Sequence, residues 1–298
     1  MGTQASDVGD GCDNNPTNCR ATHIPAALAR LTVPTAARRS VNRCNLSAEA
    51  LASLAFQLAP VALEVDGVLP LHRGLFERLD AFAEAAERGA LFQHYMTAHF
   101  LLDDPSAQGL TDHARIDRSR LDYLRLLRGW LFDSEGREGA VLKAWVESRF
   151  GLLTQFHRQP LGGADSAARA AFEHERAAGL YGTGALEAQI DLLYAFAQYE
   201  LGRRHPGQRH LVLYRGISGR HAVAQLDTLA DGRPVVLLNN LSSFSASRER
   251  ADEFGDQVLA CEVPFAKVLA FSHLLPGRLQ GEDEYLVIGG VAAARRVA

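Results

Sequence analysis

Three acidic residues stand directly before the last strand-like run of the chain. Glu282, Asp283 and Glu284 precede residues 285–291, whose β-branched and aromatic side chains are typical of a strand. Because side chains alternate along a strand, we expect Glu282 and Glu284 on one face and Asp283 on the other. Like charges this close repel each other, so placing the two carboxylates together costs free energy and suggests a function for the pair. A solvated acidic turn would give the same pattern, and the residues upstream must decide.

Two other polar motifs lie in the same part of the chain, each where a strand is expected to end: Tyr214-Arg215-Gly216 and Ser242-Ser243-Phe244-Ser245. The Arg215 guanidinium offers a planar fork of donors that suits phosphate oxygens, and Gly216 lets a ligand approach the backbone. The hydroxyls of Ser243 and Ser245 can hold a carboxylate in place. A carboxylate held in this way, such as that of Glu284, can bind a sugar hydroxyl and stabilise an oxocarbenium-like centre.

The elements that must position these residues follow from the hydrophobic periodicity. Residues 1–40 lack sustained periodicity and are expected to form a poorly ordered tail. Residues 41–298 are predicted to form a single domain, with a mainly helical lobe over 41–205 and a β-rich core over 206–298. The predicted fold class is therefore α+β, with a helical N-terminal lobe before the sheet.

Capping residues and apolar spacing locate individual elements. Ser47 and Ser247 are the predicted N-caps of two helices, and residues 61–68 are a predicted short strand. The remaining strands are expected at 210–214, 235–238, 258–263, 267–271 and 285–291. Both tryptophans, Trp130 and Trp145, are expected in the core.

Composition and charge exclude several classes of function. The 298 residues are 47% hydrophobic and 22% charged, as in a globular protein, and a net charge of -4 argues against a general nucleic-acid binder. No apolar run reaches the ~20 residues that a membrane-spanning helix needs. No secretory signal is visible at the N-terminus, so we expect a cytoplasmic protein with reduced cysteines. No group of His, Cys and acidic residues has the spacing of a metal site.

The order Arg–Ser–Glu resembles the signature of arginine-specific mono-ADP-ribosyltransferases. In that family an aromatic-Arg motif, a Ser-Thr-Ser-like motif and a Glu-x-Glu motif lie on three strands of a split sheet around NAD. In this chain Phe244 stands at the centre of the Ser-Thr-Ser place. Longer blocks are similar to one family in particular, the NAD+–dinitrogen-reductase ADP-D-ribosyltransferases: Asn42-Arg43-Cys44-Asn45-Leu46, Leu71-His72-Arg73-Gly74-Leu75-Phe76-Glu77-Arg78-Leu79, Asn239-Asn240-Leu241-Ser242-Ser243-Phe244, Arg250-Ala251-Asp252-Glu253-Phe254-Gly255 and Gly281-Glu282-Asp283-Glu284-Tyr285. The similarity runs from about Asn42 to about Gly290.

The resemblance implies NAD as co-substrate and a role for each motif residue. Arg215 would contact the phosphate and ribose of NAD, and the Gly216 backbone would lie near the nicotinamide amide. Ser243 would orient Glu284, and Ser245 would support the site. Glu284 would bind the 2′-hydroxyl of the nicotinamide ribose and stabilise the oxocarbenium ion.

Glu282 would engage the target guanidinium, which is protonated at neutral pH and a poor nucleophile until it loses a proton. The implied reaction is transfer of ADP-ribose to an arginine of dinitrogenase reductase, the nitrogenase iron protein, with control by a PII signalling protein. Three alternatives stay open: a transferase with another target, an NAD glycohydrolase, and a catalytically silent regulatory module. Arg73, in a block that echoes the one around Arg215, competes for the NAD role but lies at a predicted helix start.

Overall fold

The computed structural model describes residues 26–104, 122–180, 185–218, 223–277 and 283–297. Its helices, in chain order, are α1 (Ala26–Ala29), η1 (Thr35–Ala37), α2 (Ala48–Leu51), α3 (Leu54–Leu58), α4 (Val68–Leu71), α5 (Arg73–Leu79), α6 (Ala85–His99), α7 (Tyr123–Phe132), α8 (Arg137–Phe150), α9 (Ala167–Leu180), α10 (Ala185–Arg204), α11 (Arg248–Asp252) and η3 (Phe265–Lys267). The strands are β1 (Phe156–His157), β2 (Gln159–Pro160), β3 (His210–Ile217), β4 (Ala224–Thr228), β5 (Pro234–Ser245), β6 (Gln257–Pro264), β7 (Val268–Phe271) and β8 (Glu284–Val297).

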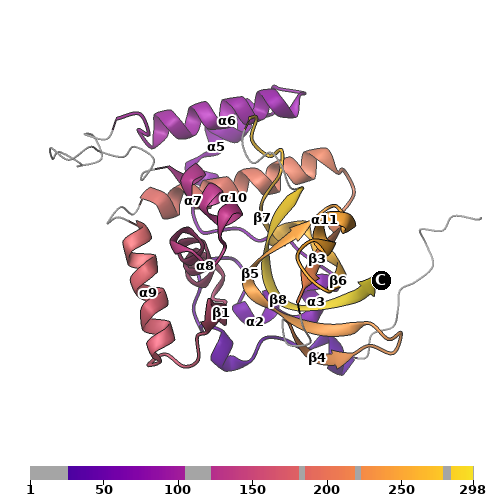
Figure 1. Ribbon diagram of the computed structural model, residues 1–298. Helices are drawn as coiled ribbons and strands as arrows, with labels where there is room; N and C mark the ends of the chain where they lie inside the picture. Colours follow the sequence, from indigo (N-terminus) through magenta and orange to yellow (C-terminus); the bar gives the residue numbers. More distant parts are fainter. Residues whose placement is uncertain (1–25, 105–121, 181–184, 219–222, 278–282, 298) are drawn as a thin grey trace, which may run out of the picture.

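This arrangement confirms the predicted α+β class, with helices first and a sheet core after them. In Figure 1 the long helices α6 to α10 gather on one side of the molecule, and the strands β3 to β8 lie on the other. The short helix α3 packs against β6 and β8, where the Gln57 amide bonds the backbone of Glu262 and Ala293. None of the helices within the described ranges is long and apolar enough to cross a membrane.

The six-stranded antiparallel sheet has the order β4-β5-β3-β6-β8-β7, and β5 also pairs with β8. The first half of β8 pairs with the end of β5 and with β7, whereas its second half pairs with the start of β5 and with β6. The register shifts between Leu238 and Leu241. At that point a Cβ on Gly289 would lie 1.8 Å from the Asn239 carbonyl oxygen, so the close approach of the strands requires glycine. All six strands thus belong to one sheet, in which β8 changes its second neighbour from β7 to β6 along its length.

One main cluster of buried apolar residues runs through both the helices and the strands. Tyr194 on α10 joins the two parts, because its hydroxyl donates to the carbonyl oxygens of Leu63 (3.2 Å) and Ala266 (2.7 Å). A buried ion pair between Arg88 on α6 and Glu200 on α10 holds the long helices together, with Arg88 Nη2 3.1 Å from Glu200 Oε2. The helical part is therefore continuous with the core that supports the sheet.

Several predicted elements are confirmed, and the differences have local causes. Ser47 and Ser247 cap α2 and α11 by accepting bonds from the backbone of Ala50 and Arg250. The strand predicted at 61–68 is wrong: this stretch makes only an isolated bridge, and α4 begins directly after a turn at Gly67, whose φ of 80° is left-handed.

Two further differences concern the tail and the sheet edge. Residues 26–40 of the predicted tail contain α1 and η1, and their Val33 and Ala37 are buried in the main cluster. Strand β4 was not predicted, because all five of its residues are exposed and it lies at the edge of the sheet. An edge strand with no buried face lacks the apolar alternation by which strands are found.

Candidate active site

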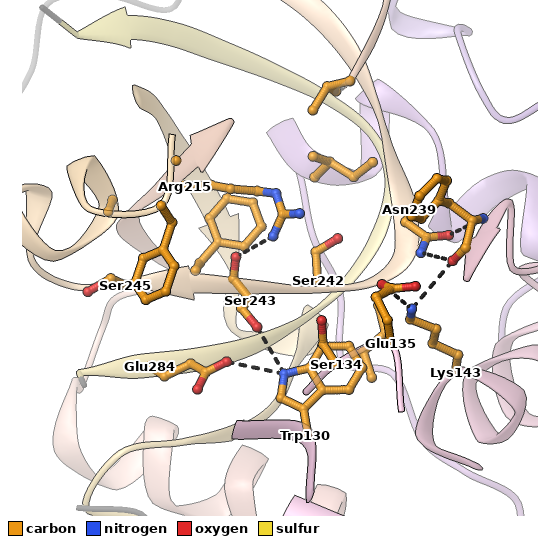
Figure 2. Close-up of a pocket in the computed structure, with 18 of the residues that line it drawn as sticks. Trp130, Ser134, Glu135, Lys143, Arg215, Asn239, Ser242, Ser243, Ser245 and Glu284 are labelled. Carbon is orange, nitrogen blue, oxygen red and sulfur yellow. Dashed lines mark hydrogen bonds and ion pairs between the residues drawn. The ribbon is translucent and has the colours of Figure 1, made fainter. Parts of the chain in front are cut away.

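A pocket of about 860 Å³ opens between the sheet and the turn that joins α7 to α8. Its walls come from β3, β5, the start of β8 and the end of α7 (Figure 2). Strands β3 and β5 are paired at one position, Tyr214 with Ser245, so the sheet opens beside this pair. The three motifs meet here, because Arg215, Gly216, Ser242, Ser243, Ser245 and Glu284 all line the pocket.

Glu284 is the first residue of β8 and lies opposite Ser245 of β5. Two hydrogen bonds between the Glu284 backbone and Ser272 fix its position. The Glu284 amide donates to Ser272 Oγ (2.9 Å), and the Ser272 amide donates to the Glu284 carbonyl (2.8 Å). The side chain is 9% exposed and points into the pocket. The carboxylate is thus presented from the hydrogen-bonded start of β8.

The expected alternation of the three acidic residues is wrong at Asp283. Its φ of 47° is left-handed, so the extended strand begins only at Glu284. The side chains of Glu282 and Glu284 therefore cannot be assigned to one face by counting along a strand. Glu282 itself lies outside the described residues.

The serine motif lies inside β5 rather than after a strand, since β5 runs on to Ser245. Ser243 faces Leu286 across the β5–β8 pairing, and Ser245 faces Glu284. The Ser245 hydroxyl also accepts a bond from the Ser247 amide (3.0 Å), which ties the end of β5 to the cap of α11. The strand thus fixes the spacing between the two serines and the glutamate.

Trp130, at the end of α7, is buried as expected but also lines the pocket. Its indole N–H lies 2.9 Å from Ser243 Oγ and 3.1 Å from Glu284 Oε1, so one donor serves both motif residues (Figure 2). The expectation of a core residue is confirmed without qualification for Trp145. For Trp130 this expectation missed the contact with the site, because an apolar helical stripe does not show which group the indole nitrogen will bond.

Arg215 belongs to β3, which continues past it to Ile217 instead of ending at the arginine. Its Nη1 donates to the Ser243 carbonyl oxygen (2.6 Å), and the guanidinium lies 5.9 Å from the centre of the Phe244 ring. Within the described residues its buried Nε has no hydrogen-bond partner. Burial lowers the pKa of Arg215, and electrostatic interactions with Cys261, Glu135 and Glu284 oppose that shift. A buried guanidinium with a spare donor suits an anionic ligand such as a phosphate.

The packing of α11 against β3 requires glycine at position 216. A Cβ at this position would lie 2.1 Å from the Ala251 carbonyl oxygen, so only glycine lets α11 sit this close to β3. The competing arginine, Arg73, is exposed on α5 and is not among the residues that line the pocket.

A lysine on the pocket wall was not found from the sequence. Lys143 on α8 is 1% exposed, and its Nζ lies 2.7 Å from Glu135 Oε1 and 3.3 Å from His157 Nδ1. Burial lowers the pKa of Lys143, whereas the neighbouring Glu135 raises it. The signal that could have drawn attention to it is rarity, because this is one of two lysines among 31 basic residues.

Comparison with known proteins gives two matches that cover most of the chain. The family model described as "Dinitrogenase reductase ADP-ribosyltransferase (DRAT)" matches residues 41–296. The chain is 40% identical over 258 residues to a curated protein of Rhodospirillum rubrum named NAD(+)--dinitrogen-reductase ADP-D-ribosyltransferase, and the alignment covers 84% of this chain and 92% of that protein. No solved structure matches the chain. The matched range contains every residue assigned to the Arg, Ser and Glu motifs.

Proposed function

Because this chain belongs to the dinitrogenase reductase ADP-ribosyltransferase family, we propose that it transfers ADP-ribose from NAD+ to an arginine side chain of dinitrogenase reductase. The modification inactivates that protein and so regulates nitrogen fixation. One observation carries the proposal to this chain's own residues: Arg215, Ser243 and Glu284, from three different strands, line a single pocket. The pocket volume of about 860 Å³ is within the range of small-molecule sites.

Arg215 is proposed to bind the phosphates of NAD. Its guanidinium is held by the Ser243 carbonyl and by the Phe244 ring, and its Nε is free to donate. The charge is stabilised by no ion pair within the described residues, so a pyrophosphate would supply the missing counter-charge. In this proposal Arg215 binds the anionic part of NAD and Glu284 binds its nicotinamide ribose.

Glu284 is proposed to act on the nicotinamide ribose. The bond from C1′ to the nicotinamide nitrogen breaks, its electron pair leaves with neutral nicotinamide, and positive charge develops at C1′ and the ring oxygen. The Glu284 carboxylate stabilises that charge and accepts a hydrogen bond from the ribose hydroxyl. An arginine nitrogen of the protein substrate then bonds to C1′ and gives up a proton, for which Glu282 is the proposed acceptor.

The decisive experiment follows label from NAD in the presence of dinitrogenase reductase. Glu284→Gln keeps the shape of the side chain but removes its charge, and it is expected to lose both protein labelling and NAD cleavage. Glu282→Gln is expected to lose labelling while keeping some NAD hydrolysis. Glu64→Gln is the matched control, because Glu64 is exposed and lies outside the pocket.

Each alternative function has its own outcome in this experiment. Free ADP-ribose without labelled protein would identify a glycohydrolase, and labelling of another protein alone would identify a different target. Absence of NAD cleavage by the wild type would identify a silent binding module. Equal loss of labelling and hydrolysis in Glu282→Gln would refute the division of labour between the two glutamates.

Three further features belong to the same proposal. We place the reaction in the cytoplasm, where NAD and dinitrogenase reductase meet. A PII signalling protein is the proposed regulator, on the strength of the family resemblance. Residues 41–298 are proposed to act as one domain, because the main buried cluster includes residues from α2 to β8.

A further inference from the structure

The helical part of the molecule reaches into the proposed active site through one side chain. Trp130 is 113 residues before Ser243 and 154 before Glu284, yet its indole nitrogen bonds both. We infer that Trp130 is a positioning residue that orients Glu284 and Ser243 for cleavage of NAD. This inference rests on the proposed function and adds a residue from outside the Arg, Ser and Glu motifs.

The geometry of the indole suits this role. Tryptophan has a single N–H and no acceptor, so its nitrogen can only donate. With distances of 2.9 Å to Ser243 Oγ and 3.1 Å to Glu284 Oε1, the shared donor sets where both acceptors lie relative to each other. The family resemblance implies that Ser243 orients Glu284; in this structure the indole links the two.

The indole is itself held firmly. Trp130 is 2% exposed, and Lys143 Nζ lies 5.8 Å from the centre of its ring. The preceding residue is Gly129, where a Cβ would lie 2.3 Å from the Glu138 side chain, so α7 can approach α8 closely at this point. The ion pair between Arg125 and Glu138 joins the same two helices. A donor that is fixed before substrate arrives needs no reorganisation during the reaction.

The hydrogen bond leaves the carboxylate able to work. An ionised glutamate has two oxygens with about four acceptor positions, so a donor on Oε1 is compatible with a ribose hydroxyl on the same group. A bond from this fixed N–H to an ionised carboxylate is charge-assisted, and it holds the Glu284 group in one orientation. The helical lobe therefore completes the site, because the docking of α7 against the sheet fixes the orientation of the Glu284 carboxylate.

The test compares two tryptophan substitutions. Trp130→Phe keeps an aromatic ring but removes the N–H. Trp145→Phe is the matched control, because Trp145 is also buried and loses an indole bond, to Asp191 Oδ1 (2.7 Å), but does not line the pocket. For each variant, kcat for NAD cleavage, the Kd of NAD and Tm are measured on the full chain.

We expect Trp130→Phe to lower kcat by roughly ten- to a hundred-fold, the effect of losing a hydrogen bond to a charged group, while the Kd of NAD changes by less than about threefold. Trp145→Phe is expected to keep the wild-type kcat even where its Tm falls. A kcat of Trp130→Phe within twofold of the wild type would overturn the inference, as would equal losses of kcat in both variants.

A second substitution covers the case in which Trp130→Phe does not fold. Benzothienylalanine at position 130 has the shape of tryptophan with sulfur in place of the N–H, and it is expected to show the same loss of kcat. Full activity of this protein would overturn the inference. Failure of the proposed function looks different, because the wild type itself would then cleave no NAD.

Discussion

Lys267 allows a quantitative test of how the sheet is packed. It ends η3 beneath the sheet, where its Nζ donates to the Gly289 carbonyl (2.9 Å) and lies 5.6 Å from the centre of the Phe56 ring. Within the described residues no carboxylate pairs with it. Burial lowers the pKa of Lys267 from 10.5 to about 7, because the charged ammonium is poorly solvated there.

The sign of the pH effect follows from proton binding. Below pH 7 both the folded and the unfolded chain hold the proton, and the buried charge lowers stability most. As pH rises through 7, the folded protein releases the proton, whereas the unfolded chain keeps it up to about pH 10.5. The free energy of unfolding therefore rises with pH in this window, by about 1.4 kcal/mol per unit at most. Between pH 7 and 8.5 the gain is roughly 2 kcal/mol.

The assay is urea unfolding of the wild type, Lys267→Met and Lys267→Gln at pH 7.0 and 8.5. Neither variant has a charge to lose, so the wild type should gain roughly 2 kcal/mol relative to both across this interval. Effects of other titrating groups, such as the buried Cys261 thiol whose pKa burial raises to about 12, cancel in the comparison. Parallel pH profiles for all three proteins would refute the assignment of a neutralised lysine beneath the sheet.

The remaining predictions concern the site and its packing. Arg215→Lys is expected to lower kcat/KM for NAD by roughly ten- to a hundred-fold, because lysine lacks the planar fork of donors; an unchanged value in initial-rate assays would contradict the phosphate role. Phe132 is 94% exposed on the pocket wall, so Phe132→Ser should raise KM for dinitrogenase reductase severalfold and leave NAD hydrolysis without protein unchanged. Gly216→Ala should lower the free energy of unfolding by about 2 kcal/mol or more, since its Cβ would meet the Ala251 carbonyl at 2.1 Å. Gly202→Ala, which has open space on α10, should slightly raise Tm in the same thermal scans.

The motif residues could be found from the sequence because each lies in a short segment with its own local pattern. The strand-like run around Arg215, the small hydroxyl residues at Ser243 and Ser245, and the acidic start of β8 at Glu284 follow from residue type and spacing. Their order then resembled that of a known family. Local patterns were weaker at strand ends: β3 and β5 extend further than predicted, and Asp283 has a left-handed φ that no alternation rule reveals.

The sequence by itself therefore determined the fold class, the family and the candidate residues of the Arg, Ser and Glu motifs. Only the tertiary structure decided that Trp130 serves this site. The indole nitrogen finds its partners only after α7 docks on strands more than a hundred residues later in the chain. The same holds for Lys143, which would be a solvated charge on an isolated helix but is buried beside the pocket in the folded protein. Helical spacing shows which residues share a face, and the packing of the whole chain sets what that face meets.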